Sequence, residues 1–271
     1  MTSAPRPAPG LPSREAGAAL PHFRSEGNGP LLLCLHGIGN SSASFDAQFA
    51  AFSSVMRVVA WDAPGYASSP PLSAAPGMDG YADLAASLIR ELGHDDAVVL
   101  GMSWGGVIAA RLAQRHPSLV RALVLGDSTR GSAQSPAQAA AMRARPDDLA
   151  VQGPDAFAAA RARRLLRPDA PPAEVEAATT AMASAIRLPG YAHAAHSMAT
   201  TNLDGALAAI KAPTLILYGA SDNVTGRPEA KALATQIPNA ALREIPAAGH
   251  LANQENPTAF NTELSTFLTT L

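Results

Sequence analysis

The segment GMSWGG (101–106) combines a hydroxyl nucleophile with glycine on both sides. It follows the apolar run AVVL (97–100) and precedes a helical pattern over residues 104–116. A serine on a sharp strand-to-helix turn needs small neighbours, because larger side chains would clash with nearby backbone. Such a turn exposes the hydroxyl at the sheet edge and points the positive end of the helix at a developing oxyanion. The pattern predicts that Ser103 is the nucleophile of an acyl-transfer reaction.

A serine hydroxyl is a poor nucleophile until a base takes its proton. The candidate base is His250, which follows the expected strand ALREI (241–245) and precedes the C-terminal helix. We therefore expect it at the same sheet edge as Ser103. The other reading of His250 is a hydrogen-bonded loop histidine without a catalytic role.

Strands that alternate with helices must position these two side chains. Continuous apolar runs are typical of strands buried on both faces of a parallel sheet. Such runs occur at residues 31–35, 55–61, 97–100, 122–125 and 214–219, and the strand ALREI at 241–245 follows them. Helical spacing occurs at residues 83–92, 104–116 and 257–271. The alternation predicts an α/β fold: a mostly parallel sheet flanked by helices, with ligands bound at the carboxyl ends of the strands.

The stretch 131–209 interrupts this alternation. It is rich in alanine, helical in pattern and punctuated by prolines, and nothing in it is typical of a strand. We interpret it as a helical cap, which leaves residues 1–130 and 210–271 as the core. Residues 1–20 are rich in Pro, Ala and Gly, so we expect a loose arm or weak edge strands there.

Substrate contacts are expected from the cap. An arginine that reaches inward could hold a substrate carboxylate, and Arg187 is the candidate for that role. Because the cap also carries many acids, we interpret one run of arginines as a solvated helix face: Arg161, Arg163, Arg164 and Arg167. The candidate substrate-binding residues are Tyr191, His193, Met198 and Arg187.

Composition excludes several functions. The 271 residues carry 22 acidic and 20 basic side chains, so no broad basic face for nucleic acid is expected. Cys34 is the only cysteine and lies in a buried-strand pattern, which excludes a disulfide and favours core packing. No apolar run is long enough to span a membrane, and the first residues lack the apolar core of a secretory signal. We expect a cytoplasmic protein that binds a small molecule.

Five segments, in this order, resemble enzymes of the α/β-hydrolase fold. They are LLLCLHGIGNSSASF (31–45), VVAWDAPGYASS (58–69), VVLGMSWGGVIA (98–109), TLILYGASDNVT (214–225) and IPAAGHLANQENP (245–257). The resemblance covers residues 30–271. The His250 loop and the Ser103 turn are similar to those of 3-oxoadipate enol-lactonase-like hydrolases and small-molecule esterases, with Trp104 where methionine is commoner.

The resemblance implies a third residue, an acid that fixes the tautomer of the histidine. Asp222 follows the run 214–219 and precedes His250, which gives the chain order serine, aspartate, histidine expected of this fold. Asp127 ends the preceding strand, a position that some members use, so it stays an alternative.

The segment HGIG (36–39) resembles the oxyanion-hole loop of the family. The resemblance implies the backbone N–H groups of Ile38 and Trp104 as donors to the oxyanion, with His36 as a structural hydrogen-bonding residue beneath the loop.

These residues predict a serine hydrolase that needs no cofactor and cleaves a carboxylic ester or lactone of a small molecule. A metal is not expected, because the pair His193 and His196 has no third ligand at suitable spacing. The alternatives are a hydrolase of C–C bonds in ring-cleavage products (vinylogous diketones), a cofactor-free perhydrolase, and a non-enzymatic ligand receptor with this fold.

Overall fold

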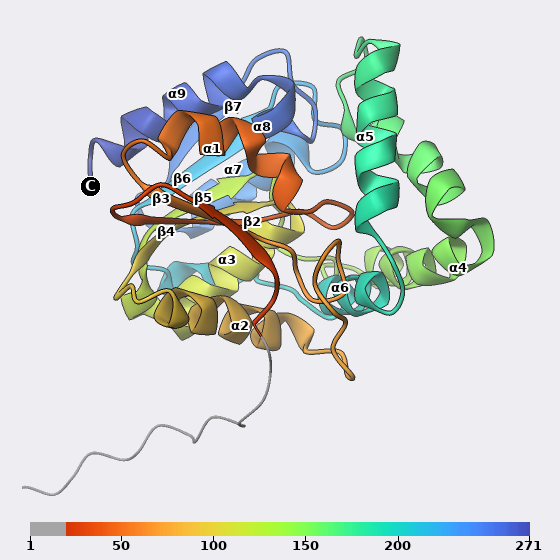
Figure 1. Cartoon of the computed structure of the whole chain (residues 1–271), viewed down its shortest axis with the longest axis horizontal. Coiled ribbons are helices and arrows are strands. Elements are labelled where there is room, and N and C mark those ends of the chain that lie inside the picture. The colour runs from red at the N-terminus through yellow and green to blue at the C-terminus, as the bar shows by residue number, and fades with distance from the viewer. Residues whose placement is uncertain (1–19) are drawn as a thin grey trace, which may run out of the picture.

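A computed structural model describes residues 20–271, so the arm expected at the N-terminus lies outside the described residues except for Leu20. Within this described part of the chain, seven strands form one sheet in the order β1-β3-β2-β4-β5-β6-β7. β1 pairs with β3 antiparallel, and the other neighbours are parallel. The predicted fold class is confirmed: a mostly parallel sheet is flanked by helices (Figure 1).

The six predicted strands form where the apolar runs lie. They are β2 (Leu31–Leu35), β3 (Arg57–Trp61), β4 (Ala97–Met102), β5 (Val120–Gly126), β6 (Thr214–Gly219) and β7 (Ala241–Ile245). Every residue of β2, β4 and β6 is buried, which explains why these runs are continuous rather than alternating. β1 (Phe23–Glu26) was not predicted, because this polar strand lies at the sheet edge and is partly exposed.

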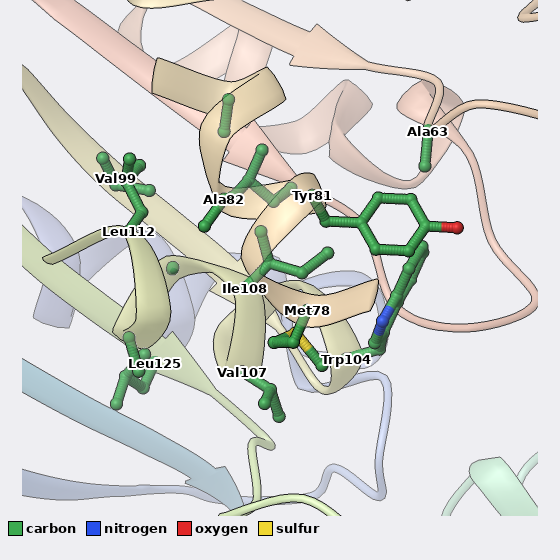
Figure 2. Close-up of a cluster of buried hydrophobic side chains, with 14 of the residues drawn as sticks. Ala63, Met78, Tyr81, Ala82, Val99, Trp104, Val107, Ile108, Leu112 and Leu125 are labelled. Atoms are coloured by element: carbon green, nitrogen blue, oxygen red, sulfur yellow. The ribbon is translucent and has the colours of Figure 1, made fainter. Parts of the chain in front are cut away.

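Helices cover both faces of the sheet. One face packs against α2 (Gly77–Glu91), α3 (Trp104–Arg115) and α7 (Gly226–Gln236). The other packs against α1 (Asp46–Phe52), the short α8 (Ala252–Glu255) and α9 (Pro257–Leu268). Alternate strand residues divide between the two cores: Leu33 faces the first and Cys34 the second, where it is fully buried. α2 and α3 also pack against each other, and Figure 2 shows Tyr81 of α2 beside Trp104 of α3.

Three helices lie between β5 and β6 in the chain: α4 (Pro136–Leu165), α5 (Pro172–Ala185) and α6 (Gly190–Ala199). We call them the inserted helices. They gather at one side of the sheet in Figure 1. α4 is broken at Gly153, whose φ of +74° is not helical, and Pro154 begins its second half. Among residues 20–271, no helix combines the length and apolarity needed to cross a membrane.

Candidate active site

Ser103 occupies a strained turn between β4 and α3. Its φ of +50° is rarely adopted by a residue with a side chain. A Cβ atom at Gly101 would lie 2.2 Å from the carbonyl oxygen of Gly105, and one at Gly105 would lie 2.0 Å from that of Leu35. Positions 101 and 105, two residues to either side of the serine, therefore require glycine. The turn that these glycines permit holds the Ser103 hydroxyl at the carboxyl edge of the sheet.

Three side chains from three different loops meet at this edge. Nε2 of His250 lies 3.0 Å from Oγ of Ser103, and Nδ1 of His250 lies 3.0 Å from Oδ2 of Asp222. Only 5% of the histidine side chain is exposed, and the aspartate side chain is fully buried. The arrangement connects a hydroxyl, an imidazole and a carboxylate in one continuous line of hydrogen bonds.

Asp222 is held in its ionised form. Burial alone would raise the pKa of this carboxyl group. The hydrogen bond and charge of His250, together with hydrogen bonds from the backbone amides of Gly226 and Val224, outweigh burial and hold the pKa well below its usual range. The hydroxyl of Thr225 also donates to Oδ2, at 2.8 Å. The carboxylate is thus fixed in place and charged at neutral pH.

The pKa of His250 moves the other way. Burial lowers it, but the hydrogen bond and charge of Asp222 raise it more strongly, and the charge of Asp127 adds to the rise. The positive charge of Arg145 opposes this rise. The resulting pKa lies above the ordinary value of 6.5, so the imidazole is a stronger base than a free histidine side chain.

Asp127, the alternative acid, has a different role in the structure. It directly follows β5 with a φ of +44°, and its buried carboxylate accepts hydrogen bonds from the backbone N–H groups of Gly219, at 2.8 Å, and Ala252, at 3.0 Å. Burial raises its pKa to about 7. Gly219 ends the strand before Asp222, and Ala252 follows His250 by two residues. Asp127 therefore joins the segment that leads to Asp222 to the segment that carries His250.

The loop after β2 lies directly against Ser103. A Cβ atom at Gly37 would lie 3.3 Å from Cβ of Ser103. Nδ1 of the fully buried His36 lies 2.8 Å from the carbonyl oxygen of Gly37, and its Nε2 accepts a hydrogen bond from the backbone N–H of Ala63. Burial lowers the pKa of His36 to about 4, so the ring stays neutral and fixes the loop beside Ser103.

Trp104, the residue after the serine, is the first residue of α3 and is fully buried. Its indole N–H donates a 3.0 Å hydrogen bond to the hydroxyl of Ser197 on α6. Its ring meets Tyr81 edge to face, with centroids 4.8 Å apart (Figure 2). The side chain thus connects the turn at Ser103 to the inserted helices, while its backbone N–H begins the helix next to Ser103.

A cavity of about 290 Å³ opens at the Ser103 hydroxyl. The sheet side of its wall includes Ile38, Ser103 and His250. Residues of all three inserted helices complete it, among them Met142, Met182, Tyr191 and Met198. Among residues 20–271, no three His, Cys, Asp or Glu side chains cluster closely enough to hold a metal ion.

Comparison with known proteins identifies the fold family. A family model described as the alpha/beta hydrolase fold matches residues 30–257. The chain belongs to this family. A pimeloyl-(acyl-carrier protein) methyl ester esterase of Aromatoleum aromaticum is 30% identical, over 85% of this chain and 94% of the relative. A 3-oxoadipate enol-lactonase of Acinetobacter baylyi is 26% identical, over 86% of each chain. A thermophilic esterase from Thermogutta terrifontis superposes with a TM-score of 0.85 at 27% identity, over 92% of this chain and 93% of that one.

Within this α/β-hydrolase fold, two of the four candidate substrate contacts line the cavity and two do not. Tyr191 and Met198 line it. His193 lies on the same helix but is not part of the wall, and the guanidinium of Arg187 donates hydrogen bonds to the backbone carbonyls of Ala67 and Ser69. The structure therefore places neither side chain in the wall of this cavity: Arg187 binds the loop after β3, and His193 is partly exposed on α6.

The arginines that do line the cavity belong to α4. Arg145, Arg161 and Arg164 contribute to the wall, although the run that includes Arg161 and Arg164 was interpreted as a solvated face. In the sequence, the one signal that could have placed Arg161 and Arg164 on the same helix face as Phe157 is their spacing. The three residues follow one another at helical intervals of four and three.

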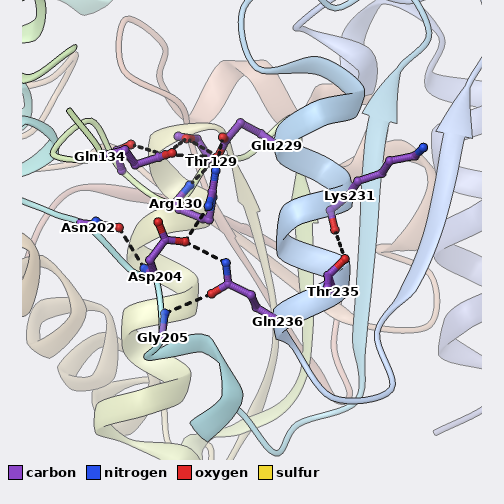
Figure 3. Close-up of polar contacts among 11 residues, drawn as sticks. Thr129, Arg130, Gln134, Asn202, Asp204, Gly205, Glu229, Lys231, Thr235 and Gln236 are labelled. Atoms are coloured by element: carbon purple, nitrogen blue, oxygen red, sulfur yellow. Dashed lines mark hydrogen bonds and ion pairs between the residues drawn. The ribbon is translucent and has the colours of Figure 1, made fainter. Parts of the chain in front are cut away.

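The acid in the cavity wall is already neutralised. Glu229 of α7 lies 2.7 Å from a guanidinium nitrogen of Arg130, and the hydroxyl of Thr129 donates to it at 3.0 Å. Arg130 also pairs with Asp204, so it connects α7 to the segment that follows α6 (Figure 3). The wall near Ser103 is consequently positive on balance.

Proposed function

We propose that the protein is a serine hydrolase that cleaves a carboxylic ester or lactone of a small molecule through an acyl-enzyme on Ser103. The observation that carries the proposal is the continuous hydrogen-bonded line from Ser103 through His250 to Asp222 at the mouth of the cavity. The relatives named as an esterase and an enol-lactonase support the same reaction class.

In the proposed mechanism, His250 takes the proton from Ser103 Oγ as that oxygen attacks the substrate carbonyl carbon. Asp222 keeps Nδ1 protonated and stabilises the imidazolium that forms. The backbone N–H groups of Ile38 and Trp104 hold the oxyanion, and loss of one such donor costs about 100- to 1,000-fold in rate. His250 then protonates the leaving oxygen, and water repeats the sequence on the acyl-enzyme.

In this proposal, residues 131–209 act as a cap that determines which substrates fit. The supporting observation is that the inserted helices supply methionine, tyrosine and arginine side chains to a cavity whose other wall carries the reacting groups. A cavity of about 290 Å³ suits a small acyl group rather than a long chain.

The test combines turnover with labelling. The protein is expected to hydrolyse 4-nitrophenyl butyrate and to be modified stoichiometrically by a fluorophosphonate at Ser103, detected by mass spectrometry of the peptide that contains it. Ser103→Ala should abolish both, whereas Ser132→Ala, a matched change in the same cavity wall, should retain labelling. Absence of labelling and turnover would favour the ligand-receptor alternative. Turnover of vinylogous diketones in preference to esters would favour the C–C hydrolase.

A further inference from the structure

Two arginines of α4 lie in the cavity wall with little anionic compensation. Arg145 and Arg161 both line the cavity that contains Ser103 and His250. Within residues 20–271, no carboxylate forms an ion pair with Arg145. Arg161 contacts one acid, Asp148, at 3.2 Å, and the side chain of that acid is half exposed. The wall therefore carries more positive than negative charge.

The side chain of Arg161 is held against an aromatic surface. The guanidinium carbon of Arg161 lies 4.1 Å from the ring centroid of Phe157, and the Phe157 ring meets Tyr191 edge to face at 5.2 Å. Both rings are buried. Such stacking fixes the orientation of the guanidinium and so reduces the ordering cost when an anion binds.

The charges in this wall affect one another and the reacting groups. The pKa of Arg161 is lowered by its burial and by the nearby charges of Arg145 and Arg164. Burial raises the pKa of the Tyr191 hydroxyl, with Arg145 and Arg161 opposing the rise, so this hydroxyl stays protonated and can donate. The positive charge of Arg145 also lowers the pKa of His250. The cationic groups thus lie close to each other, to a buried donor and to the base.

We propose that Arg145 and Arg161 bind a carboxylate carried by the substrate, so that the preferred substrates are small esters or lactones with a free carboxylate. This specificity rests on the proposed hydrolase function. A carboxylate in this position would relieve the repulsion between the like charges of the two arginines. It would also accept the pair of parallel N–H hydrogen bonds that a guanidinium donates to a carboxylate. The methionines and Ile38 of the remaining wall would contact the apolar chain between the carboxylate and the reacting carbonyl.

The experiment compares matched substrates. Monomethyl succinate, glutarate and adipate each carry a carboxylate, and the corresponding methyl ester amides are neutral and nearly the same size. We expect the wild-type protein to show kcat/KM at least about 10-fold higher for the carboxylate in the best-fitting pair. Arg145→Gln and Arg161→Gln should each reduce this ratio about 10- to 100-fold, mainly through KM. Arg161→Lys, which keeps the charge without the planar donor pair, should restore part of the ratio.

Arg143→Gln is the matched control, because Arg143 lies on the same helix, is exposed and does not line the cavity. It should leave the ratio unchanged, which separates local binding from the net charge of the protein. A wild-type ratio near one, or a ratio that neither Arg145→Gln nor Arg161→Gln changes, would overturn the carboxylate site while leaving the hydrolase proposal intact.

A binding measurement distinguishes failure of the site from failure of the reaction. In the Ser103→Ala background, calorimetric titration with the three half-esters should show binding that weakens at least 10-fold on adding Arg145→Gln or Arg161→Gln, and not on adding Arg143→Gln. This result would support the site even if no ester were cleaved. Equal affinity in all of these variants, or no binding to the Ser103→Ala protein, would contradict it.

Discussion

The backbone N–H of His250 donates a 2.7 Å hydrogen bond to the carbonyl oxygen of Leu165, the last residue of α4. The loop that carries the proposed base is therefore fastened to an inserted helix rather than only to the sheet. Glu255, whose side chain is 2% exposed, strengthens the same junction: it accepts hydrogen bonds from the backbone N–H groups of Gly249, at 2.6 Å, and Arg167, at 2.8 Å.

Glu255→Ala should loosen both sides of this junction. Two partly buried backbone N–H groups would lose a charged acceptor, and each such loss costs about 1–3 kcal/mol. We expect the free energy of unfolding to fall by roughly 2–4 kcal/mol and kcat to fall as His250 becomes less well placed. Urea denaturation and ester kinetics measure the two effects. Glu263→Ala, a partly exposed acid on α9, serves as the control and should change neither by much. Unchanged stability in Glu255→Ala would show that the junction is held by other contacts.

The two candidate acids should respond differently to the same substitution. Asp222→Asn removes the charge that fixes the tautomer of His250, so kcat should fall on the order of 10,000-fold. Asp127→Asn replaces a carboxylate oxygen that accepts from a backbone N–H by an NH₂ group that cannot accept. We expect this change to cost about 1–3 kcal/mol of stability and to reduce kcat only modestly. Steady-state kinetics with thermal unfolding test both variants, and the reverse ranking of kcat would transfer the role of acid to Asp127.

The pH dependence follows from the base. Only neutral His250 can take the serine proton, so kcat/KM should rise with pH and reach half of its maximum at the pKa of His250, above 6.5. The pKa of Asp222 is lowered, so this carboxylate stays ionised over the same range and adds no second step. Loss of its charge in Asp222→Asn should move the pKa of His250 downward, which NMR titration of the imidazole can measure. An upward shift in this variant would contradict the proposed electrostatic link.

Gly105→Ala tests the geometry of the turn at Ser103. The added Cβ atom would lie 2.0 Å from the carbonyl oxygen of Leu35, so the backbone must move. We expect a loss of at least about 3 kcal/mol in unfolding free energy, or failure to fold. Gly153→Ala is the control for crowding: unlike Gly105, Gly153 has a φ of +74° that is unfavourable for alanine, but no atom lies within 4 Å of the new Cβ. It should cost about 1 kcal/mol. Similar losses for both variants would mean that crowding at Gly105 is not the limiting factor.

The strands and the Ser103 turn could be predicted because their signals are local. An apolar run such as LLLCL is continuous only where both faces of a strand are buried, and glycine at 101 and 105 is required by backbone contacts of 2.0–2.2 Å. β1 carries no such signal, since FRSE is short, largely polar and partly exposed at the edge of the sheet.

The arginines show why the cavity wall could not be predicted. Arg187 and Arg161 both lie in alanine-rich segments with no clear apolar face. The cavity is lined by Arg161 and not by Arg187 because of the break at Gly153 and the way α4 packs against α5 and α6. A sequence pattern over a few residues predicts neither the direction of that break nor this packing. Arg187 instead binds carbonyls of a loop about 120 residues earlier in the chain.

The hydrogen bond between the Trp104 indole and Ser197 bears on how this protein could acquire new substrates. In a chimera that receives the inserted helices of a relative, the indole N–H would stay buried beside the nucleophile without an acceptor unless the donor helix brought a serine to the same place. That penalty, about 1–3 kcal/mol, would fall on the residue whose backbone is proposed to hold the oxyanion. Divergence within this lineage should therefore proceed by point changes on the cavity side of α4 and α6, with residues 104 and 197 inherited as a pair.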